Sequence, residues 1–334
     1  MRVWELENSF GIENLRLVEK PSPTPGKGQI VVGMKAASLN YRDLITIKGM
    51  GGTSLPLIPF SDGAGIVEAV GEGVARVKMG DRVCPLFFQS WMDGPVTAES
   101  RNRALGGSVP GVLQEHMLID AEGVYPFPAH LSFEEAATLP CASLTAWRAI
   151  VDEAPIKAGD TILVQGTGGV SIFALQFAHA MGAKVIATSS SDEKLAHAKA
   201  LGADHLINYR TTPEWGKKAL ELTGGRGVDV VVEVGGEKTL PQSLTAARVG
   251  GAIVIIGVLG GFSENIMIPV LFSKNLRLIG ISVGSRAQFA AMAAAIDKWK
   301  LKPVIDKTYK LEELPAALER MQAGAHFGKI CLTF

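Results

Sequence analysis

The chain has 334 residues, which is long enough for two domains that each have a hydrophobic core. Its 33 basic and 33 acidic residues cancel, which argues against a partner held by charge, such as nucleic acid or an anionic membrane. No apolar run approaches the ~20 residues that cross a bilayer, and the cysteines at 84, 141 and 331 form no disulfide framework, so we expect a reduced, cytoplasmic protein.

Residues 1–122 are dense in proline and glycine, and short alternating runs such as 29–36 predict antiparallel strands. The first clear helix signal is Ser132 with Glu135 three residues later, which is the pattern of a capping box. A β-rich lobe therefore precedes the more helical middle of the chain.

From residue 160 onward, strand and helix patterns alternate. Strands are predicted at 160–165, 184–189, 205–209, 228–234, 252–257 and 276–281, and helices at 170–181, 192–201 (capped by Ser191) and 240–248. Near-continuous apolar runs such as VDVVVEV are typical of parallel strands covered on both faces. The alternation predicts an α/β fold with a doubly wound parallel sheet, which binds ligands outside the carboxyl ends of its strands.

The segment GTGGVS, residues 166–171, joins the first of these strands to the first helix. Such a loop lets the backbone approach a diphosphate, and the helix N-terminus supplies unpaired N–H groups. Serine replaces the last glycine of the usual G-x-G-x-x-G pattern, and an ordinary turn or a flavodoxin-like sheet without a nucleotide remains the alternative. The surrounding strands favour a dinucleotide site, with contacts expected from Gly166, Thr167, Gly168, Gly169 and Val170.

The tail after Ser282 predicts an alanine-rich helix at 288–298 and a capped helix at 312–322. It closes with an apolar strand at 329–334, whose expected partner is the β-rich first lobe.

Several strings, in this order, resemble the medium-chain dehydrogenase/reductase superfamily along the whole chain: SLNYRDLITIKG, PFSDGAGIVEAVGEGV followed by GDRV, LTAW, GTGGV, LGADHLINY, VDVVVEVGG and GKICLTF. The resemblance implies a GroES-like β-rich catalytic domain at 1–122 and 272–334, and a Rossmann domain at 123–271. It also implies an active-site cleft at their junction and a homodimer formed through an edge strand of the Rossmann sheet.

The zinc alcohol dehydrogenases of this superfamily hold a catalytic metal with Cys, His and Cys. By the resemblance, these positions hold Asn40, Ser61 and Cys141 in this chain. An amide and a hydroxyl are poor zinc donors, so we expect no zinc and no metal site. Cys141 lies in the apolar string TLPCASLTAW and is expected to be a buried small hydrophobe rather than a reactive thiol.

The same comparison puts Arg42 where those enzymes carry a proton-relaying hydroxyl, and arginine does not give up its proton. The string NYRD looks most like the zinc-free quinone oxidoreductase-like and enoyl reductase-like branch. That likeness suggests Asn40 and Tyr41 as the donors to the substrate oxygen. The alternatives are that Asn40 holds the nicotinamide and that Tyr41 is a packed aromatic; a buried Arg42–Asp43 ion pair is compatible with either.

In NAD-specific Rossmann domains an acid at the end of the second strand binds the ribose 2′-hydroxyl. On the family's register this position is Ser189, which does not repel a 2′-phosphate, so we expect NADPH rather than NAD. Ser190, Lys194 and Tyr209 are expected to flank that phosphate; the alternative is that the serines only cap a helix and Lys194 is solvated. The resemblance adds Thr145, Gly235 and Gly257, and also Lys329 at the pyrophosphate, with a solvated surface lysine as the alternative.

The expected function is therefore transfer of a hydride from NADPH to a quinone or an α,β-unsaturated carbonyl compound, a small-molecule substrate. An alcohol dehydrogenase or carbonyl reductase of the same superfamily, working without a metal or with one, is the first alternative, and a non-catalytic NADPH sensor or structural protein is the second. The segment 86–103 is expected to border the cleft. Its aromatics Phe87, Phe88 and Trp91 either line an apolar pocket or belong to the core of the lobe.

Overall fold

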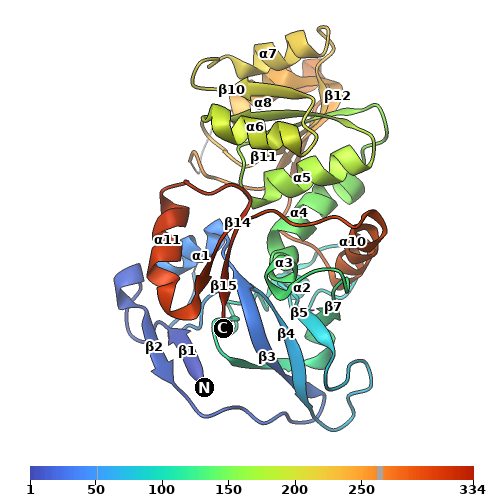
Figure 1. Cartoon of the computed structure of the whole chain (residues 1–334). Coiled ribbons are helices and arrows are strands. Elements are labelled where there is room, and N and C mark those ends of the chain that lie inside the picture. The colour runs from blue at the N-terminus through green and yellow to red at the C-terminus, as the bar shows by residue number, and fades with distance from the viewer. Residues whose placement is uncertain (51, 262–265) are drawn as a thin grey trace. The chain divides into compact units, whose positions relative to one another are not determined.

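The computed structural model describes residues 1–334 except 51 and 262–265 (Figure 1). Packing divides it into two compact units: Met1–Leu144 with Val283–Phe334, and Thr145–Ser282. The first unit runs beyond residue 122 because α3 (Phe133–Ala137) packs on its strands β3 and β4. The domain ranges given above, 1–122 with 272–334 and 123–271, stay a prediction.

The described part of the first unit contains a seven-stranded sheet, in which β6 pairs with β3 beside the main path. In sheet order its strands are β14 (Ile305–Lys310), β15 (Lys329–Thr333), β3 (Gln29–Ser38), β4 (Asp62–Val70), β5 (Arg82–Pro85) and β7 (Val124–Pro126), with β6 at His116–Asp120; β1 (Arg2–Glu5) and β2 (Arg16–Glu19) form a separate pair. Strand β15 runs antiparallel to β3, with Cys331 opposite Ser38. The predicted pairing of the C-terminal strand with the first lobe is confirmed.

The helices of this unit are short except for two near the C-terminus. They are η1 (Ile12–Asn14), α1 (Tyr41–Ile47), α2 (Ala98–Arg101), η2 (Ala121–Gly123), α3, η3 (Leu139–Ser143), α10 (Arg286–Trp299), η5 (Leu311–Glu313) and α11 (Leu314–Gln322). The predicted capping box of α3 is present, since Ser132 Oγ accepts from Glu135 N at 3.2 Å and Glu135 Oε2 accepts from Ser132 N at 2.7 Å. Helix α1 was not predicted.

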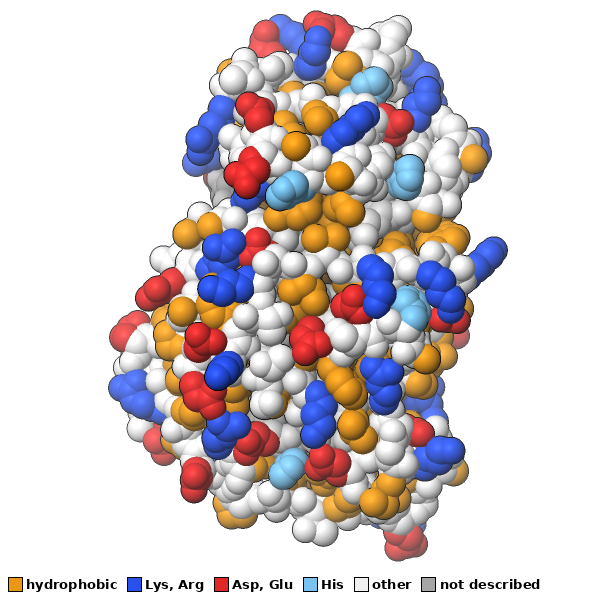
Figure 2. Space-filling view, viewed as in Figure 1, with side chains coloured by type: hydrophobic (Ala, Val, Ile, Leu, Met, Phe, Trp, Pro, Cys, Tyr) orange, Lys and Arg blue, Asp and Glu red, His pale blue; other side chains and the backbone are white. Residues whose placement is uncertain are grey.

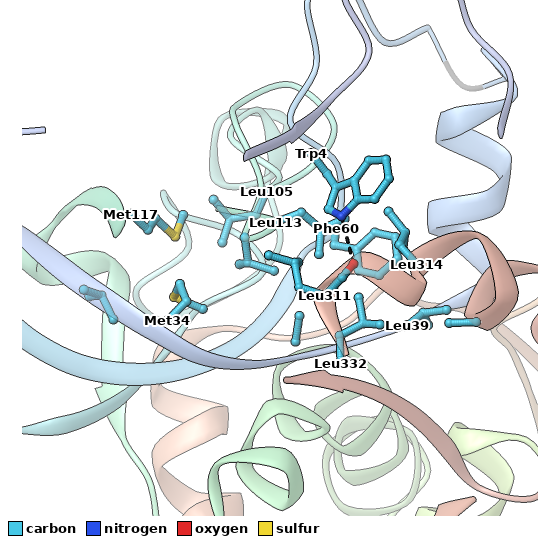
Figure 3. Packing of buried hydrophobic residues seen from close by; sticks show 14 of the residues in the cluster. Trp4, Met34, Leu39, Phe60, Leu105, Leu113, Met117, Leu311, Leu314 and Leu332 are labelled. Atoms are coloured by element: carbon cyan, nitrogen blue, oxygen red, sulfur yellow. Dashed lines mark hydrogen bonds between the residues drawn. The ribbon is translucent and has the colours of Figure 1, made fainter. Parts of the chain in front are cut away.

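Figure 3 shows the core that joins the two ends of the chain. The indole of Trp4, on β1, donates a hydrogen bond to the carbonyl of Leu311 at 2.9 Å. Leu314 and Leu332, from the C-terminal segment, pack in the same cluster as Phe60. A β-rich unit built from both chain ends is therefore held by one shared hydrophobic core.

The described part of the second unit contains a six-stranded parallel sheet of order β10-β9-β8-β11-β12-β13. The strands are β8 (Thr161–Gln165), β9 (Lys184–Ser189), β10 (His205–Asn208), β11 (Val228–Glu233), β12 (Ala247–Ile255) and β13 (Arg277–Gly280). The helices are α4 (Leu144–Trp147, at the boundary), η4 (Arg148–Glu153), α5 (Gly169–Ala180), α6 (Asp192–Ala200), α7 (Trp215–Leu222), α8 (Leu240–Ala246) and α9 (Ile268–Ser273). This is the 3-2-1-4-5-6 order of the Rossmann fold, which confirms the predicted doubly wound sheet.

One boundary was predicted wrongly. The helix expected at 240–248 ends at Ala246, and β12 begins at Ala247 rather than at residue 252. Ala247 pairs with Val228, and the register then shifts before Ala252 meets Val230. Pairing with β11 therefore extends the strand backward over residues whose local pattern favoured a helix.

Acidic and basic side chains are interspersed over the face shown in Figure 2. Among the described residues, no helix is long and apolar enough to cross a membrane.

Candidate functional site

The glycine loop lies at the point where the strand order of the Rossmann sheet reverses. Strand β8 ends at Gln165, Gly166 has φ +68°, and Gly168 is the N-cap of α5. A Cβ added at Gly166 or at Gly168 would meet nothing within 4 Å. The first N–H groups of a helix lack intrahelical partners, so this open cradle fits the diphosphate of a dinucleotide.

The structure explains why serine stands at position 171, where the usual pattern has its last glycine. Its hydroxyl is buried in the first turn of α5 and donates to the carbonyl of Gln165 at 2.6 Å. The side chain therefore ties the start of the helix to the end of β8. Thr167 is buried in the loop beside it.

The ends of β9 and β10 bring together the residues predicted to distinguish NADP from NAD. Ser189 is the last residue of β9, and its carbonyl accepts from Tyr209 N at 3.0 Å. Its hydroxyl accepts from Ser191 N at 3.3 Å, while Ser191 caps α6 by accepting from Lys194 N at 3.3 Å. Ser190 lies between Ser189 and Ser191, and Ser191 is the helix cap. Contact of Ser189, Ser190, Lys194 and Tyr209 with a 2′-phosphate stays a prediction.

Two other predicted cofactor residues are glycines with close neighbours. A Cβ at Gly235 would lie 2.3 Å from Thr239 Oγ1, and one at Gly257 would lie 2.6 Å from the carbonyl oxygen of Val234. Packing alone therefore requires glycine at both positions, and their contact with a cofactor stays a prediction. The same holds for Thr145, which is buried in α4.

Glu233, at the end of β11, is a functional candidate that the sequence patterns did not reveal. Its carboxylate is fully buried and accepts from the backbone N–H groups of Gly235 at 2.8 Å and Gly236 at 2.9 Å. The available signal was an acid inside the otherwise apolar run VVVEVGG, because carboxylates are seldom fully buried without partners.

Asn40 and Lys329, which are 289 residues apart in the sequence, meet in the first unit. Asn40 is the N-cap of α1, but the Asp43 carboxylate caps the backbone N–H of Asn40 at 2.7 Å. The Lys329 ammonium donates to Asn40 Oδ1 and to the carbonyl of Leu39, each at 2.5 Å. Lys329 is only 3% exposed, so the alternative of a solvated surface lysine is wrong, and its predicted contact with a pyrophosphate stays a prediction.

This contact fixes the orientation of the Asn40 amide. A lysine ammonium only donates hydrogen bonds, so the amide atom that it contacts must be the oxygen. The remaining Nδ2 is buried and makes no hydrogen bond within the described residues. Burial raises the pKa of the neighbouring Asp62 carboxyl, and the charge of Lys329 and the nearby Asn40 amide oppose that rise. Tyr41, at the first position of α1, is 46% exposed.

The positions that hold zinc in the metal enzymes do not fit that ion here. Ser61 Oγ donates to Asp62 Oδ1 at 2.7 Å, and the backbone N–H of Cys141 donates to Asp62 Oδ2 at 3.0 Å. Cys141 is half-buried rather than buried as expected. Desolvation, followed by the charge of Asp62, raises the pKa of its thiol, which favours an unreactive side chain. Zinc binds thiolates and imidazoles, and the described residues contain no cluster of three His, Cys, Asp or Glu that could hold a metal.

Arg42 is occupied as a structural ion-pair partner. Its guanidinium lies 3.3 Å from the fully buried Asp43 carboxylate and donates to the carbonyls of Leu105 at 2.9 Å and Gly106 at 3.1 Å. Burial raises the pKa of Asp43 to about 6, and the charge of Arg42 opposes that rise. The interpretation of Arg42–Asp43 as a buried ion pair is confirmed.

The aromatic side chains of segment 86–103 belong largely to the core. Phe87 and Phe88 are buried in an edge-to-face contact, with ring centroids 4.7 Å apart, and Arg42 lies over the Phe87 ring. Trp91 is also buried and lines a cavity of about 510 Å³ together with Asp93, Glu99 and Arg103.

Comparisons with known proteins agree with this geometry. The family model described as alcohol dehydrogenase GroES-like domain matches residues 26–129, and the one described as zinc-binding dehydrogenase matches residues 169–298. A zinc-type alcohol dehydrogenase-like protein of Schizosaccharomyces pombe is 45% identical, over 96% of each chain. A quinone oxidoreductase of Rattus norvegicus is 31% identical (93% of this chain, 90% of that one), and a crotonyl-CoA reductase of Streptomyces collinus is 30% identical (95% and 81%).

The similar solved structures are also named as alcohol dehydrogenases and a crotonyl-CoA carboxylase/reductase. A Sinorhizobium meliloti 1021 protein that carries the name of an alcohol dehydrogenase superposes with a TM-score of 0.94 at 44% identity, over 100% of this chain and 98% of that one. An NAD-dependent alcohol dehydrogenase gives 0.91 at 34%, over 100% of both chains. The crotonyl-CoA carboxylase/reductase AntE in complex with NADP gives 0.90 at 25%, over 100% and 94%.

The fold and the loop at its switch point define a nicotinamide-dependent oxidoreductase. The chain belongs to the medium-chain dehydrogenase/reductase superfamily.

The open cradle yields a first prediction. Gly168→Ala should change the free energy of unfolding by no more than about 1 kcal/mol, because φ is −79° and the added Cβ meets nothing within 4 Å, although alanine is a poorer N-cap than glycine. The methyl group would occupy the space of the diphosphate, and we expect the Kd for NADPH, measured by nicotinamide fluorescence, to rise about tenfold or more. Gly280→Ala, on β13 and equally uncrowded, is the matched control with an unchanged Kd. Equal affinities for both variants would place the diphosphate elsewhere.

Proposed function

We propose that the protein is an NADPH-dependent, zinc-independent oxidoreductase that transfers a hydride to a quinone or to an α,β-unsaturated carbonyl compound. The observation that carries this proposal is the Asn40 amide: Lys329 holds its oxygen, and its buried Nδ2 makes no hydrogen bond within the described residues. A buried donor without an acceptor costs about 1–3 kcal/mol, which a ligand oxygen would relieve. The quinone oxidoreductase and crotonyl-CoA reductase among the relatives support the same substrate class.

In this mechanism the bound cofactor supplies the hydride. Asn40 Nδ2 and, as a second donor, the Tyr41 hydroxyl donate hydrogen bonds to the oxygen on which negative charge develops. Arg42 takes no part in proton transfer, because its guanidinium is committed to Asp43 and to two carbonyls. The alternative for Asn40 is that Nδ2 holds the nicotinamide amide group.

For the cofactor, we propose NADPH with NAD as the alternative. Ser189, Ser190 and Tyr209 lie together at the ends of β9 and β10, and the backbone of Lys194 starts the adjacent helix. The position usually acidic in NAD enzymes is a serine. The NADP complex of the AntE protein supports this choice, while the NAD-dependent alcohol dehydrogenase among the similar structures supports the alternative.

Ser189→Asp tests this preference. A carboxylate at the end of β9 repels a 2′-phosphate and accepts from a free 2′-hydroxyl, so affinity should shift from NADPH toward NADH. Loss of a charge-assisted hydrogen bond of about 1.5–3 kcal/mol corresponds to a roughly ten- to hundredfold rise in the Kd for NADPH. Ser191→Ala, which removes only the cap of α6, should leave the NADPH to NADH ratio unchanged. A ratio unaltered by Ser189→Asp would show that the ribose lies elsewhere.

The reaction is tested by NADPH oxidation with quinones, enals and simple aldehydes, with and without a strong chelator. We expect turnover with quinones or enals that the chelator does not change, and no stoichiometric zinc in the purified protein. Oxidation of simple alcohols far faster than these reductions would favour the alcohol dehydrogenase or carbonyl reductase alternative, which the name of the 45% identical relative supports. NADPH binding without any turnover would indicate the non-catalytic alternative.

Asn40→Ala and Tyr41→Phe test the donors. Loss of one preorganised donor to a developing oxyanion commonly costs ~10²–10³ in turnover, and we expect this for Asn40→Ala with NADPH saturating. Asn40→Asp, which keeps the acceptor for Lys329 but removes the donor, should be as slow. A raised Kd for NADPH in the Asn40 variants would favour the nicotinamide contact. Full turnover in both Asn40→Ala and Tyr41→Phe would show that residues 40–43 have only a structural role and that the donors to the substrate oxygen lie elsewhere.

We also propose a homodimer in a reduced, cytoplasmic setting. In the described residues β13 pairs with β12 alone, and the neighbouring α9 exposes Ile268 and Phe272 beside Met267. An unpaired sheet edge next to exposed apolar side chains is the kind of surface that a second copy covers. Free Cys84, Cys141 and Cys331 support the reduced setting. Sedimentation at micromolar concentration should give a dimer, and a monomer would contradict this proposal.

A further inference from the structure

The buried carboxylate of Glu233 sits where strands β8 and β11 lie side by side and the strand order reverses. It is held by two backbone amides, two hydroxyls and one side-chain amide. These donors are Gly235 N (2.8 Å), Gly236 N (2.9 Å), Thr239 Oγ1 (2.5 Å), Ser243 Oγ and Gln165 Nε2 (2.6 Å).

Gln165, the last residue of β8, completes the connection. Its Nε2 donates to Glu233 and to Ser243 Oγ at 2.7 Å, while its Oε1 lies 3.3 Å from the N–H groups of Val234 and Gly235. Its backbone carbonyl accepts from Ser171 in the first turn of α5. The residue therefore joins the glycine loop after β8 to the loop after β11.

The loop after β12 is tied to the same residue. The backbone carbonyl of Glu233 accepts from Ile256 N at 2.9 Å and from Gly257 N at 3.4 Å. The carboxyl ends of β8, β11 and β12 thus converge on Glu233, and in a doubly wound sheet this edge is where the ligand binds.

The hydrogen-bonding pattern requires an acid at 233 and an amide at 165. All five groups around the Glu233 carboxylate donate, and a glutamine there would turn one acceptor oxygen into an NH₂ that faces other donors. Gln165, in contrast, donates from one side-chain atom and accepts at the other. A glutamate there would put two carboxylates against each other in a buried site.

We propose that Glu233 and Gln165 are positioning residues that hold the three loops in the conformation that binds the nicotinamide cofactor. This inference rests on the proposed function, because it assumes that these loops bind that cofactor. Neither residue need contact the cofactor, since Glu233 is fully buried and acts through the backbone of Gly235, Gly236 and Gly257.

The same strand provides a matched control at its other end. Asp229 is also buried and accepts from Thr161 N at 2.8 Å, Arg226 at 2.6 Å and Arg248 at 2.5 Å. It lies at the amino end of β11, away from the loops. Asp229→Asn should lower the urea midpoint of unfolding without changing the Kd for NADPH.

The test is a charge swap read by the Kd for NADPH, from nicotinamide fluorescence, and by the urea midpoint. Glu233→Gln and Gln165→Glu alone should each raise the Kd about tenfold or more. The double variant Gln165→Glu with Glu233→Gln restores a matched donor for each acceptor, and should return to within about threefold of the wild-type Kd. Where Glu233→Gln does not fold, Thr239→Val removes a single donor and should raise the Kd about threefold.

Three results would overturn the proposal: an unchanged Kd in folded single variants, a double variant as weak as the single ones, or an equal loss in Asp229→Asn. Wild-type protein that binds NADH but not NADPH would refute the proposed cofactor, and the same ratios measured with NADH would still decide the positioning role. Binding of neither nucleotide would refute both.

Discussion

The interaction on which the nucleotide-binding half depends is the burial of one carboxylate at the end of a parallel strand. An isolated buried charge is strongly unfavourable, so Glu233 is tolerated only because five donors surround it. Those donors come from the last residue of β8, from the loop after β11 and from the start of α8. Gly236 has φ +80°, a conformation in which its N–H reaches the carboxylate. The Glu233 carboxylate thus fixes the conformation of the loop after β11, and the hydrogen bonds from that loop stabilise the buried charge.

In the first unit, buried carboxylates are stabilised by nearby cationic side chains. Asp43 and Asp62 are both buried, and burial raises the pKa of each, while the charges of Arg42 and Lys329 oppose the rise. Lys329 arrives on the C-terminal strand and Asn40 on the first turn of a short helix, so the shared core of the two chain ends is a precondition for their contact. Because the Lys329 ammonium can only donate hydrogen bonds, whereas a water can also accept them, this contact requires the oxygen of the Asn40 amide to face Lys329 and leaves the Nδ2 group facing away.

Membership in the superfamily leaves the chemistry open, because the names of the similar proteins include alcohol dehydrogenases, a quinone oxidoreductase and crotonyl-CoA reductases. The side chains at the positions that the resemblance matches to the zinc ligands bear on the choice of chemistry. These side chains are the Asn40 amide, the Ser61 hydroxyl, which is hydrogen-bonded to Asp62, and the Cys141 thiol, whose pKa is raised. They are poor ligands for zinc, which would act as a Lewis acid, but the amide and the hydroxyl can form hydrogen bonds. That favours acceptors whose developing charge a hydrogen bond can stabilise.

The sequence by itself determined the class of fold. Strand and helix periodicity located all six strands of the Rossmann sheet, and local chemistry located the caps at Ser132 and Ser191. Only the tertiary structure decided which side chains meet: Lys329 with Asn40, Ser171 with Gln165, and Gln165 with Glu233. It also ended α8 at Ala246, where pairing with β11 outweighs helix propensity. The physical reason is range, since propensity and capping act between neighbours in the chain, whereas the partner of a buried charge is set by how distant strands align.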